Sequence, residues 1–334
     1  MGLRMTVFAA LGMGVLAAPC GGLNPKNLTT GSNMLGKVSE GLEKAEECKK
    51  LDVDPSVTEE YALGGALAIH FVQRGGGLML EKDSGKAASR PGEVLHDYVN
   101  IVGKNLAAQS QRPTLEWTFG VLNDSKSFNA VSAPGGYVFI NRKVLETVDN
   151  EGQLAGVLAH EIAHVVLKHS VRQYNAAKVK TCKMVVMGES ILSPGAADAL
   201  SAGRKGDGTL DLDKEPGLLG KLAESTADQL AKGNSDEQEF EADRMAARLL
   251  VSAGYDPDDY RRLIAKTTED TSLGVNHPKK SERVKNLVSY VATLKGKEGE
   301  FPELAIEGLR SPPLKPSAMA ALRGAAPAVA KDTP

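Results

Sequence analysis

Aromatic residues are scarce in this 334-residue sequence, at 4%, whereas glycine is abundant, with 35 residues. An aromatic β-sandwich core is therefore not favoured, and we expect helices that pack through small residues. An excess of one charge is lacking too, because the formal net charge is only -2. No long basic patch is present, so the sequence predicts no nucleic-acid partner.

Long apolar runs are lacking beyond the first twenty residues, so no transmembrane helix is predicted. Arg4 and the apolar stretch 6–18 have the features of an export signal, and we expect residues 1–20 to be a signal peptide. Leu16-Ala17-Ala18-Pro19-Cys20 resembles the lipobox of bacterial lipoproteins, except that Pro19 replaces a small residue. A buried N-terminal helix is the alternative. The protein is expected in the periplasm, or at the outer membrane as a lipoprotein, of a Gram-negative bacterium.

Cysteine is scarce as well, with Cys20, Cys48 and Cys182 alone in the sequence. No CxxC pair occurs, so a thiolate zinc site is not supported. For Cys48 and Cys182 we expect two free buried thiols. A disulfide in an oxidising periplasm is the alternative.

Hydrophobic periodicity and turn residues divide the rest of the chain into a predominantly helical α+β fold. Residues 21–91 are expected to form a tether and helices, 92–295 the main domain, and 296–334 a Pro/Ala-rich disordered tail. Residues 184–217 are expected to form a long loop. Short strands over 115–122, 128–132 and 137–140 predict a small antiparallel sheet. Helices are predicted over 35–51, 56–74, 92–110, 151–177, 218–231, 236–253, 258–268 and 281–294.

The helix predicted over 151–177 contains an HExxH motif, His160-Glu161-Ile162-Ala163-His164. Residues four apart share one helical face, so the two imidazoles can converge on one Zn²⁺ at about 2.0–2.1 Å. Glu161 projects about 100° round the helix, beside the metal, where it can take a proton from an attacking water. A chance match on an amphipathic helix is the alternative reading.

A third ligand must come from elsewhere in the chain. Leu167 and Ser170 stand where metzincins have a glycine and a third histidine, which excludes that class. His169 lies about 140° from the face of His164 on a continuous helix, so we expect a surface histidine. Glu239 and Asp243 share a helical face that continues as apolar, whereas Glu237 and Glu241 are interpreted as solvated charges. Buried acids need compensation, which zinc and its histidines would provide; an exposed acidic helix is the alternative.

The sequence resembles the M48 peptidases from residue 56 to residue 294. The resemblance rests on HExxH, on the later Glu239-Phe240-Glu241-Ala242-Asp243 and on a further His277-Pro278. It implies a zincin-like domain over 92–295, with Glu239 as third ligand and Asp243 orienting a ligand histidine. It also implies an edge-strand segment that pairs with an extended peptide, over Gly136 to Ile140. The residues assigned to substrate binding are Asn129, Ala130, Gly135, Gly136, Tyr137 and Val138.

The expected function is that of a zinc metalloendopeptidase acting on cell-envelope proteins, with one Zn²⁺ per chain. Glu161 would be the general base, and His277 would stabilise the oxyanion or cap the metal. Protein or peptide substrates are expected, and contact with a membrane only through a lipid anchor. The oligomeric state is left open. The alternative is a catalytically silent, zinc-binding envelope lipoprotein with a chaperone-like role.

Overall fold

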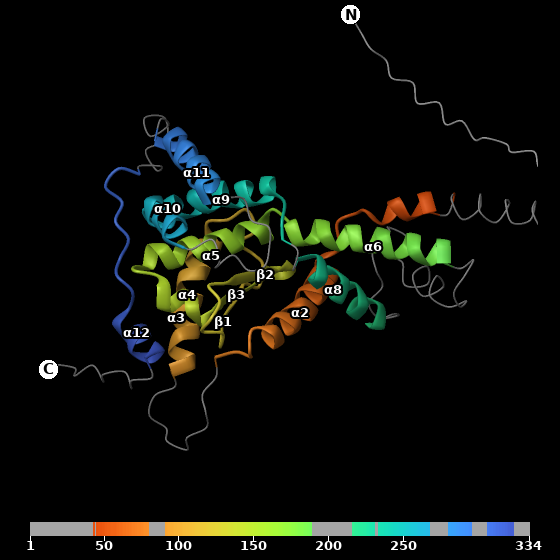
Figure 1. The fold of residues 1–334 in the computed structure, drawn as a ribbon, viewed down its shortest axis with the longest axis horizontal. Helices are drawn as coiled ribbons and strands as arrows, with labels where there is room; N and C mark the ends of the chain where they lie inside the picture. The colour runs from red at the N-terminus through yellow and green to blue at the C-terminus, as the bar shows by residue number, and fades with distance from the viewer. Residues whose placement is uncertain are drawn as a thin grey trace, which may run out of the picture.

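The structure, a computed structural model, describes residue 43 and residues 45–79, 91–188, 216–230, 233–267, 280–295 and 306–323. Figure 1 shows helices grouped around one small sheet, with α5 lying across it. The strands are β1 (Thr118–Leu122), β2 (Ala130–Ala133) and β3 (Tyr137–Asn141). The helices are η1 (Cys48–Leu51), α2 (Val57–Arg74), α3 (Pro91–Ala108), η2 (Pro134–Gly136), α4 (Arg142–Thr147), α5 (Glu151–Val166), α6 (His169–Gly188), α8 (Pro216–Leu230), α9 (Asp236–Ser252), α10 (Pro257–Lys266), α11 (Lys280–Lys295) and α12 (Pro316–Leu322).

This mostly helical fold with one small sheet confirms the predicted fold class. The signal stretch with Cys20, the site candidate His277 and most of the predicted loop 184–217 lie outside the described residues. Residues 184–188 of that predicted loop belong to α6, and its last two residues begin α8. Within the described residues, no helix combines the length and the apolar character that a membrane crossing requires.

Two predicted helix starts are confirmed by their caps. Ser56 accepts a hydrogen bond from the amide of Glu59 at the start of α2. Asn150 accepts one from the amide of Gln153 at the start of α5. Such side chains satisfy amides that have no partner within the helix.

The single helix predicted over 151–177 is in fact two helices, α5 and α6. The break falls at Lys168, whose φ of 58° places it in the left-handed region. Glycine or asparagine usually occupies such a helix-ending position, and a lysine there gives the sequence no visible stop signal. The break changes the direction of the chain just after the HExxH motif.

The sheet is mixed, whereas the sequence predicted an antiparallel one. Its order is β1-β3-β2, with β2 antiparallel to β3 and β1 parallel to β3. The chain leaving β1 forms β2 first and then returns to form β3, which lies between the other two strands. This order makes β3 the central strand and leaves β1 and β2 at the edges.

The edge at β1 is closed by α3. Asn100 donates from its side-chain amide to the carbonyl of Phe119 at 2.8 Å and accepts from the amide of Phe119 at 3.3 Å. His96 Nδ1 lies 3.4 Å from the amide of Val121. A strand edge whose backbone groups are already bonded cannot take another strand. Among the described residues, the sheet edge without a partner strand is therefore that of β2.

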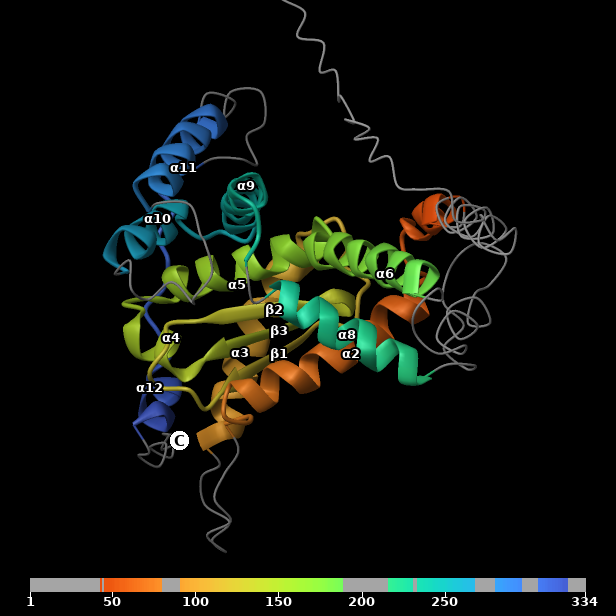
Figure 2. The same ribbon diagram turned by 45° about the vertical axis from the view of Figure 1, so that its right-hand side comes forward.

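Helix α5 is buried on nearly all sides, between the sheet and α9 (Figures 1 and 2). Leu154, Leu158 and Ile162 are fully buried in the main hydrophobic core. A helix that is apolar all round is stable only when it is enclosed. The HExxH motif is therefore held on one of the most completely enclosed elements of the fold.

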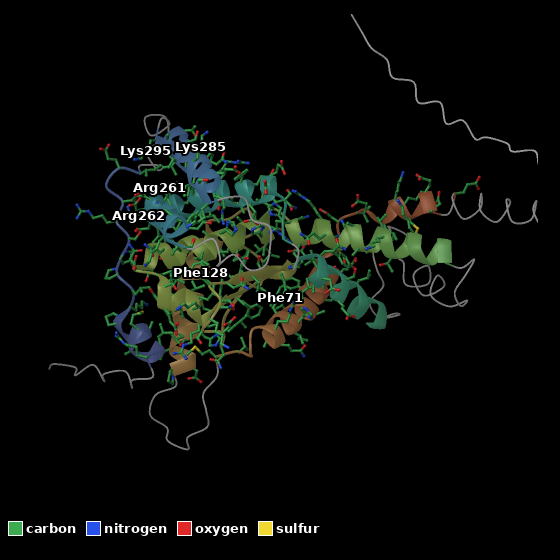
Figure 3. The ribbon with its side chains drawn as sticks, in the orientation of Figure 1. Phe71, Phe128, Arg261, Arg262, Lys285 and Lys295 are labelled. Carbon is green, nitrogen blue, oxygen red and sulfur yellow. A yellow bond between two sulfur atoms is a disulfide. The ribbon has the colours of Figure 1, made fainter. Side chains whose placement is uncertain are left out.

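Cys48 and Cys182 form a disulfide, so the expectation of two free thiols was wrong. Figure 3 shows the sulfur–sulfur bond joining the N-terminal segment to α6. The two Cα atoms are 5.7 Å apart, although 134 positions separate the residues in sequence. Two cysteines so far apart in a chain give no sequence signal of their proximity, which only the packing of η1 against α6 creates.

The tail expected to be disordered from residue 296 contains an ordered helix, α12. Ala318, Ala321 and Leu322 are buried in the main core. The Pro/Ala-rich composition predicted disorder, but these small apolar side chains fit against α3. Near the start of this segment, the carbonyl of Pro312 accepts a hydrogen bond from the amide of Glu151, at the beginning of α5.

Candidate metal centre

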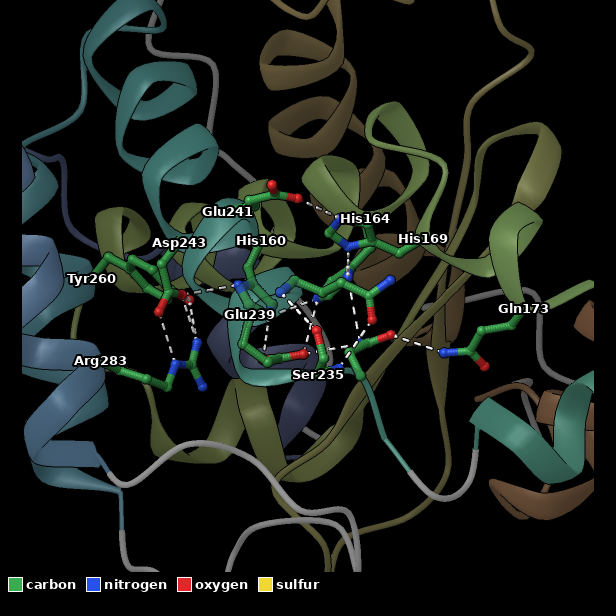
Figure 4. A network of polar contacts seen from close by, with 12 residues as sticks. His160, His164, His169, Gln173, Ser235, Glu239, Glu241, Asp243, Tyr260 and Arg283 are labelled. Atoms are coloured by element: carbon green, nitrogen blue, oxygen red, sulfur yellow. Dashed lines mark hydrogen bonds and ion pairs between the residues drawn. The ribbon is translucent and has the colours of Figure 1, made fainter. Parts of the chain in front are cut away.

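His160 and His164 occupy successive turns of α5 and turn their Nε2 atoms toward each other. The two Nε2 atoms are 3.0 Å apart and the ring centroids 4.6 Å apart. Both side chains are almost completely buried. The spacing of four residues, which predicted a shared face, has placed both rings at one point (Figure 4).

Glu239 reaches the same point from the first turn of α9. Its carboxylate oxygens lie 3.4 Å from Nε2 of His160 and 3.4 Å from Nε2 of His164. The ligand-type atoms of these three residues all lie within 4.8 Å of one another, and all three residues are buried. The predicted meeting of the HExxH helix with a distant carboxylate is therefore present in the structure.

The start of α9 positions this carboxylate. Ser235 and Gln238 form a reciprocal capping box, which fixes where the helix begins. Just before it, Asn234 donates from Nδ2 to Oε1 of Glu239 at 2.9 Å. Gln173 on α6 donates in turn to Oδ1 of Asn234 at 3.2 Å. Sequence reasoning did not find Asn234 or Gln173; Asn234 comes directly before the capping serine, a position that could have drawn attention.

Two imidazoles and a carboxylate are a common set of zinc ligands, and their burial suits a divalent cation. Burial alone would lower the pKa of His160, but hydrogen bonds to Asp243 and Glu239 raise it to about 9. The negative charge that raises this pKa also favours a metal cation at the same place. Burial holds the pKa of His164 well below its usual value, so this ring is neutral and able to bind a metal.

Behind His160 lies a buried charged cluster. Nδ1 of His160 is 3.1 Å from Oδ1 of Asp243, which accepts hydrogen bonds from Tyr260 at 2.8 Å and from Arg283 at 2.6 Å. Burial alone would raise the pKa of Asp243, but the guanidinium of Arg283 holds it well below its usual range. Asp243 is thus an ionised carboxylate in contact with Nδ1 of His160, and a carboxylate in this position typically orients a metal-binding histidine.

His169 lies behind His164, and the expectation that it would be a surface residue was wrong. Its side chain is fully buried, and its Nδ1 is 2.7 Å from Nδ1 of His164. Its Nε2 is 3.4 Å from a carboxylate oxygen of Glu241. The break at Lys168 turns His169 back toward the HExxH helix, which a continuous helix would not have done. Glu241, predicted to be only solvated, is half-exposed and contacts this ring.

A cleft of about 500 Å³ opens beside the three candidate ligands. Glu161, the predicted general base, lines it together with His160 and His164. The cleft is also lined by β2 and by the C-terminal end of α2. The lining residues that sequence reasoning did not single out include Phe71, Arg74, Asp124, Ser127, Val131 and Ser132.

The predicted substrate-binding residues fall into three groups. Asn129 and Ala130 line the cleft, at the start of the edge strand β2. Tyr137 and Val138 belong to β3, which is paired on both sides, so it cannot accept a substrate strand as predicted. The remaining two, in η2, have positive φ and pack against other parts of the protein: Gly135 against Tyr61 and Gly136 against Trp117.

A histidine pair on one helix and a glutamate from a second helix, beside an open cleft and a free sheet edge, define the HExxH class of metallopeptidases. The sequence profile of Peptidase family M48 matches residues 94–291, which is more than half of the chain. The chain belongs to this family, and the matched region contains the candidate His-His-Glu metal site.

Several curated relatives are similar to parts of this chain. The chain is 26% identical over 247 residues to the beta-barrel assembly-enhancing protease of Yersinia pestis, covering 73% of this chain and 47% of that protein. The protein of the same name in Escherichia coli K12 is 25% identical over 219 residues, which cover 64% of this chain and 41% of that protein. The mitochondrial metalloendopeptidase OMA1 of Schizosaccharomyces pombe is 35% identical over 94 residues, 28% of each chain. The chain spans less than half the length of these relatives.

Proposed function

We propose that this protein is a zinc-dependent endopeptidase that hydrolyses proteins of the bacterial cell envelope. The observation that carries the proposal is the meeting of His160, His164 and Glu239 at one buried point beside an open cleft. One zinc ion per chain fits these three ligands.

The chain's own groups provide the acid–base chemistry. Zinc held by these residues would polarise the scissile carbonyl and lower the pKa of a nearby water. Glu161 accepts the proton of the attacking water and donates it to the leaving amine. Asp243 and Arg283 keep His160 in the orientation in which its Nε2 faces the site.

Substrate binding is assigned to the edge of β2 in place of β3. An extended peptide that lies along β2 adds a strand to the sheet and passes the three candidate ligands, because β2 and these ligands line the same cleft. Asn129 and Ala130 keep the role that the sequence suggested for them. Backbone pairing of this kind selects extended segments of unfolded or misassembled proteins over folded ones.

The cell envelope is proposed as the location for two reasons. The disulfide between Cys48 and Cys182 fits an oxidising compartment. Two of the relatives are proteases whose names refer to β-barrel assembly, in Yersinia pestis and Escherichia coli. We further propose that residues 1–20 direct export and that Cys20 carries a lipid anchor. The proposed role of the protein is quality control of envelope proteins.

The test replaces Glu161 with Gln, which removes the base and leaves the three ligands in place. We expect Glu161→Gln to bind zinc as the unaltered protein does but to lose about 10²–10⁴-fold in the rate of casein cleavage. Zinc is measured by metal analysis and cleavage by release of labelled peptides.

The matched control is Glu237→Gln, the same change at an exposed position one turn before Glu241. It should leave both zinc content and cleavage unchanged. Cleavage that persists in Glu161→Gln would contradict the assignment of the base, and absence of zinc from the unaltered protein would contradict the metal site. A protein that holds zinc but does not cleave would instead match the catalytically silent alternative.

A further inference from the structure

We infer that His169 is a positioning residue of the metal site, acting on His164 from behind and itself oriented by Glu241. The inference rests on the proposed metal site and adds a role for a residue outside the three ligands. Figure 4 shows the contacts in sequence, from Glu241 through His169 to His164.

The first step concerns the two nitrogens of His164. Its Nε2 faces Nε2 of His160 and the carboxylate of Glu239, so this is the nitrogen whose lone pair is available to a metal. A neutral imidazole that binds through Nε2 carries its hydrogen on Nδ1. That hydrogen needs a buried acceptor, and Nδ1 of His169 lies 2.7 Å away.

The second step concerns the tautomer of His169. To accept from His164, its Nδ1 must carry no hydrogen, so the hydrogen is on Nε2. Nε2 lies 3.4 Å from Oε2 of Glu241. An ionised carboxylate has no hydrogen to donate, so Glu241 acts as the acceptor. The three residues therefore form a chain in which each hydrogen has one donor and one acceptor, and the chain fixes the tautomer of His164.

The two ligand histidines are thus supported in different ways. His160 is supported directly by a carboxylate, that of Asp243, whereas His164 is supported by a second imidazole with a carboxylate beyond it. His169 is not placed as a ligand, because it contacts the nitrogen of His164 that points away from His160 and Glu239. Among the described residues, the group that could hold a metal does not include it.

The bend between α5 and α6 creates this contact. Lys168 adopts a left-handed conformation, and His169 then begins α6 directly behind His164. Gln173, one turn further along α6, reaches Asn234 and through it Glu239. One face at the start of α6 therefore supports two of the three candidate ligands.

The test measures zinc affinity of the full chain by competition with a chromophoric chelator, without any assay of cleavage. His169→Leu removes the acceptor while keeping a similar volume, and we expect zinc to bind about 10- to 100-fold more weakly. His169→Asn keeps an acceptor, because its amide oxygen branches from the same carbon as Nδ1, and affinity should stay near that of the unaltered protein. Thermal unfolding of the zinc-free proteins shows whether each variant folds.

Two further variants separate positioning from packing. Tyr174→Phe removes the 2.6 Å hydrogen bond from α6 to Glu59, which contacts none of the three candidate ligands in the bonds described, and this variant should not change zinc affinity. If His169→Leu does not fold, His169→Gln takes its place, since its longer amide cannot present oxygen at the Nδ1 position. The zinc affinity of His169→Gln should be as low as that expected for His169→Leu.

Three outcomes would overturn the inference. Affinity in His169→Leu or His169→Gln equal to the unaltered protein would show that His164 needs no acceptor. Equal weakness of the Asn and Gln variants would show that His169 serves only packing. An unaltered protein that binds no zinc would remove the proposed metal site, and this inference with it.

Discussion

Single buried charges govern the surroundings of the metal site. Asp243 is almost fully buried, and the guanidinium of Arg283 donates to both of its oxygens, at 2.8 and 2.6 Å. Taking a carboxylate out of water is costly unless an opposite charge and hydrogen bonds replace the water. Arg283, which comes from α11, is the guanidinium that provides this charge, so its removal should affect the fold as well as the site.

Arg283→Met keeps the length of the side chain and removes its charge. We expect it to lower the free energy of unfolding by about 3–5 kcal/mol, because Asp243 remains buried without its cation. Urea unfolding followed by circular dichroism measures the change.

A matched comparison is Arg261→Met, on the surface of α10, where Arg261 pairs with the half-exposed Asp258. An exposed ion pair contributes about 0–1 kcal/mol, so the free energy of unfolding of this variant should be close to that of the unaltered protein. If both arginine variants lost the same free energy of unfolding, the burial of Asp243 would not be the cause of the loss in Arg283→Met.

Among these residues, the sequence predicts those whose positions follow from helical spacing. His160 and His164 are four apart within α5, and Glu239 and Asp243 are four apart within α9, so their shared faces could be predicted. The position of His169 could not, because it depends on a left-handed lysine where a glycine would have been expected. Asn234 acts through a fold-dependent contact that no spacing reveals.

Between elements, α2 and η2 pack closely where they cross at Gly64. A Cβ atom at Gly64 would stand 1.9 Å from the carbonyl oxygen of Pro134, which belongs to the backbone and cannot swing aside. At the neighbouring Gly65 the nearest atom would be the hydroxyl of Tyr137, at an acceptable 3.8 Å. The two adjacent glycines of one helix thus differ in their surroundings and provide a direct comparison.

We expect Gly64→Ala to lower the free energy of unfolding by about 1–3 kcal/mol, because the backbone of η2 has to move. Gly65→Ala should raise it by about 0.4–1 kcal/mol, since alanine restricts the unfolded chain and suits a helix. Urea unfolding of both variants measures the difference. If both substitutions stabilised the protein, α2 could not be packed as closely on η2 as described.

The elements themselves were predicted more completely than their pairing. Helical periodicity and caps such as Ser56 and Asn150 located the helices, because these signals are local. The mixed sheet was missed, because which strand lies in the centre depends on the path of the chain between β1 and β2. The substrate strand predicted at β3 fails for the same reason, and the proposal for substrate binding therefore moves to the edge strand β2.

In the molecule as a whole, the disulfide joins the N-terminal segment to α6. A link between positions 134 residues apart restricts the unfolded chain far more than the folded one. We expect the double variant Cys48→Ser, Cys182→Ser to lose about 2–4 kcal/mol of unfolding free energy, measured in urea under oxidising conditions.

A reducing agent provides the control for this prediction. It should lower the free energy of unfolding of the unaltered protein by a similar amount and leave that of the double variant unchanged. If the double variant unfolds at the same urea concentration as the oxidised protein, the disulfide does not contribute to stability. It would then also give weaker support to the proposal of an oxidising compartment.

The segment that follows α11 determines how short a working fragment can be. The family profile ends at residue 291, yet the carbonyl of Pro312 caps the first turn of α5, and α12 is buried against α3. The profile also begins after α2, which forms one wall of the cleft. A recombinant piece trimmed to residues 94–291 would lack both supports, so cloning boundaries should enclose residues 45–323.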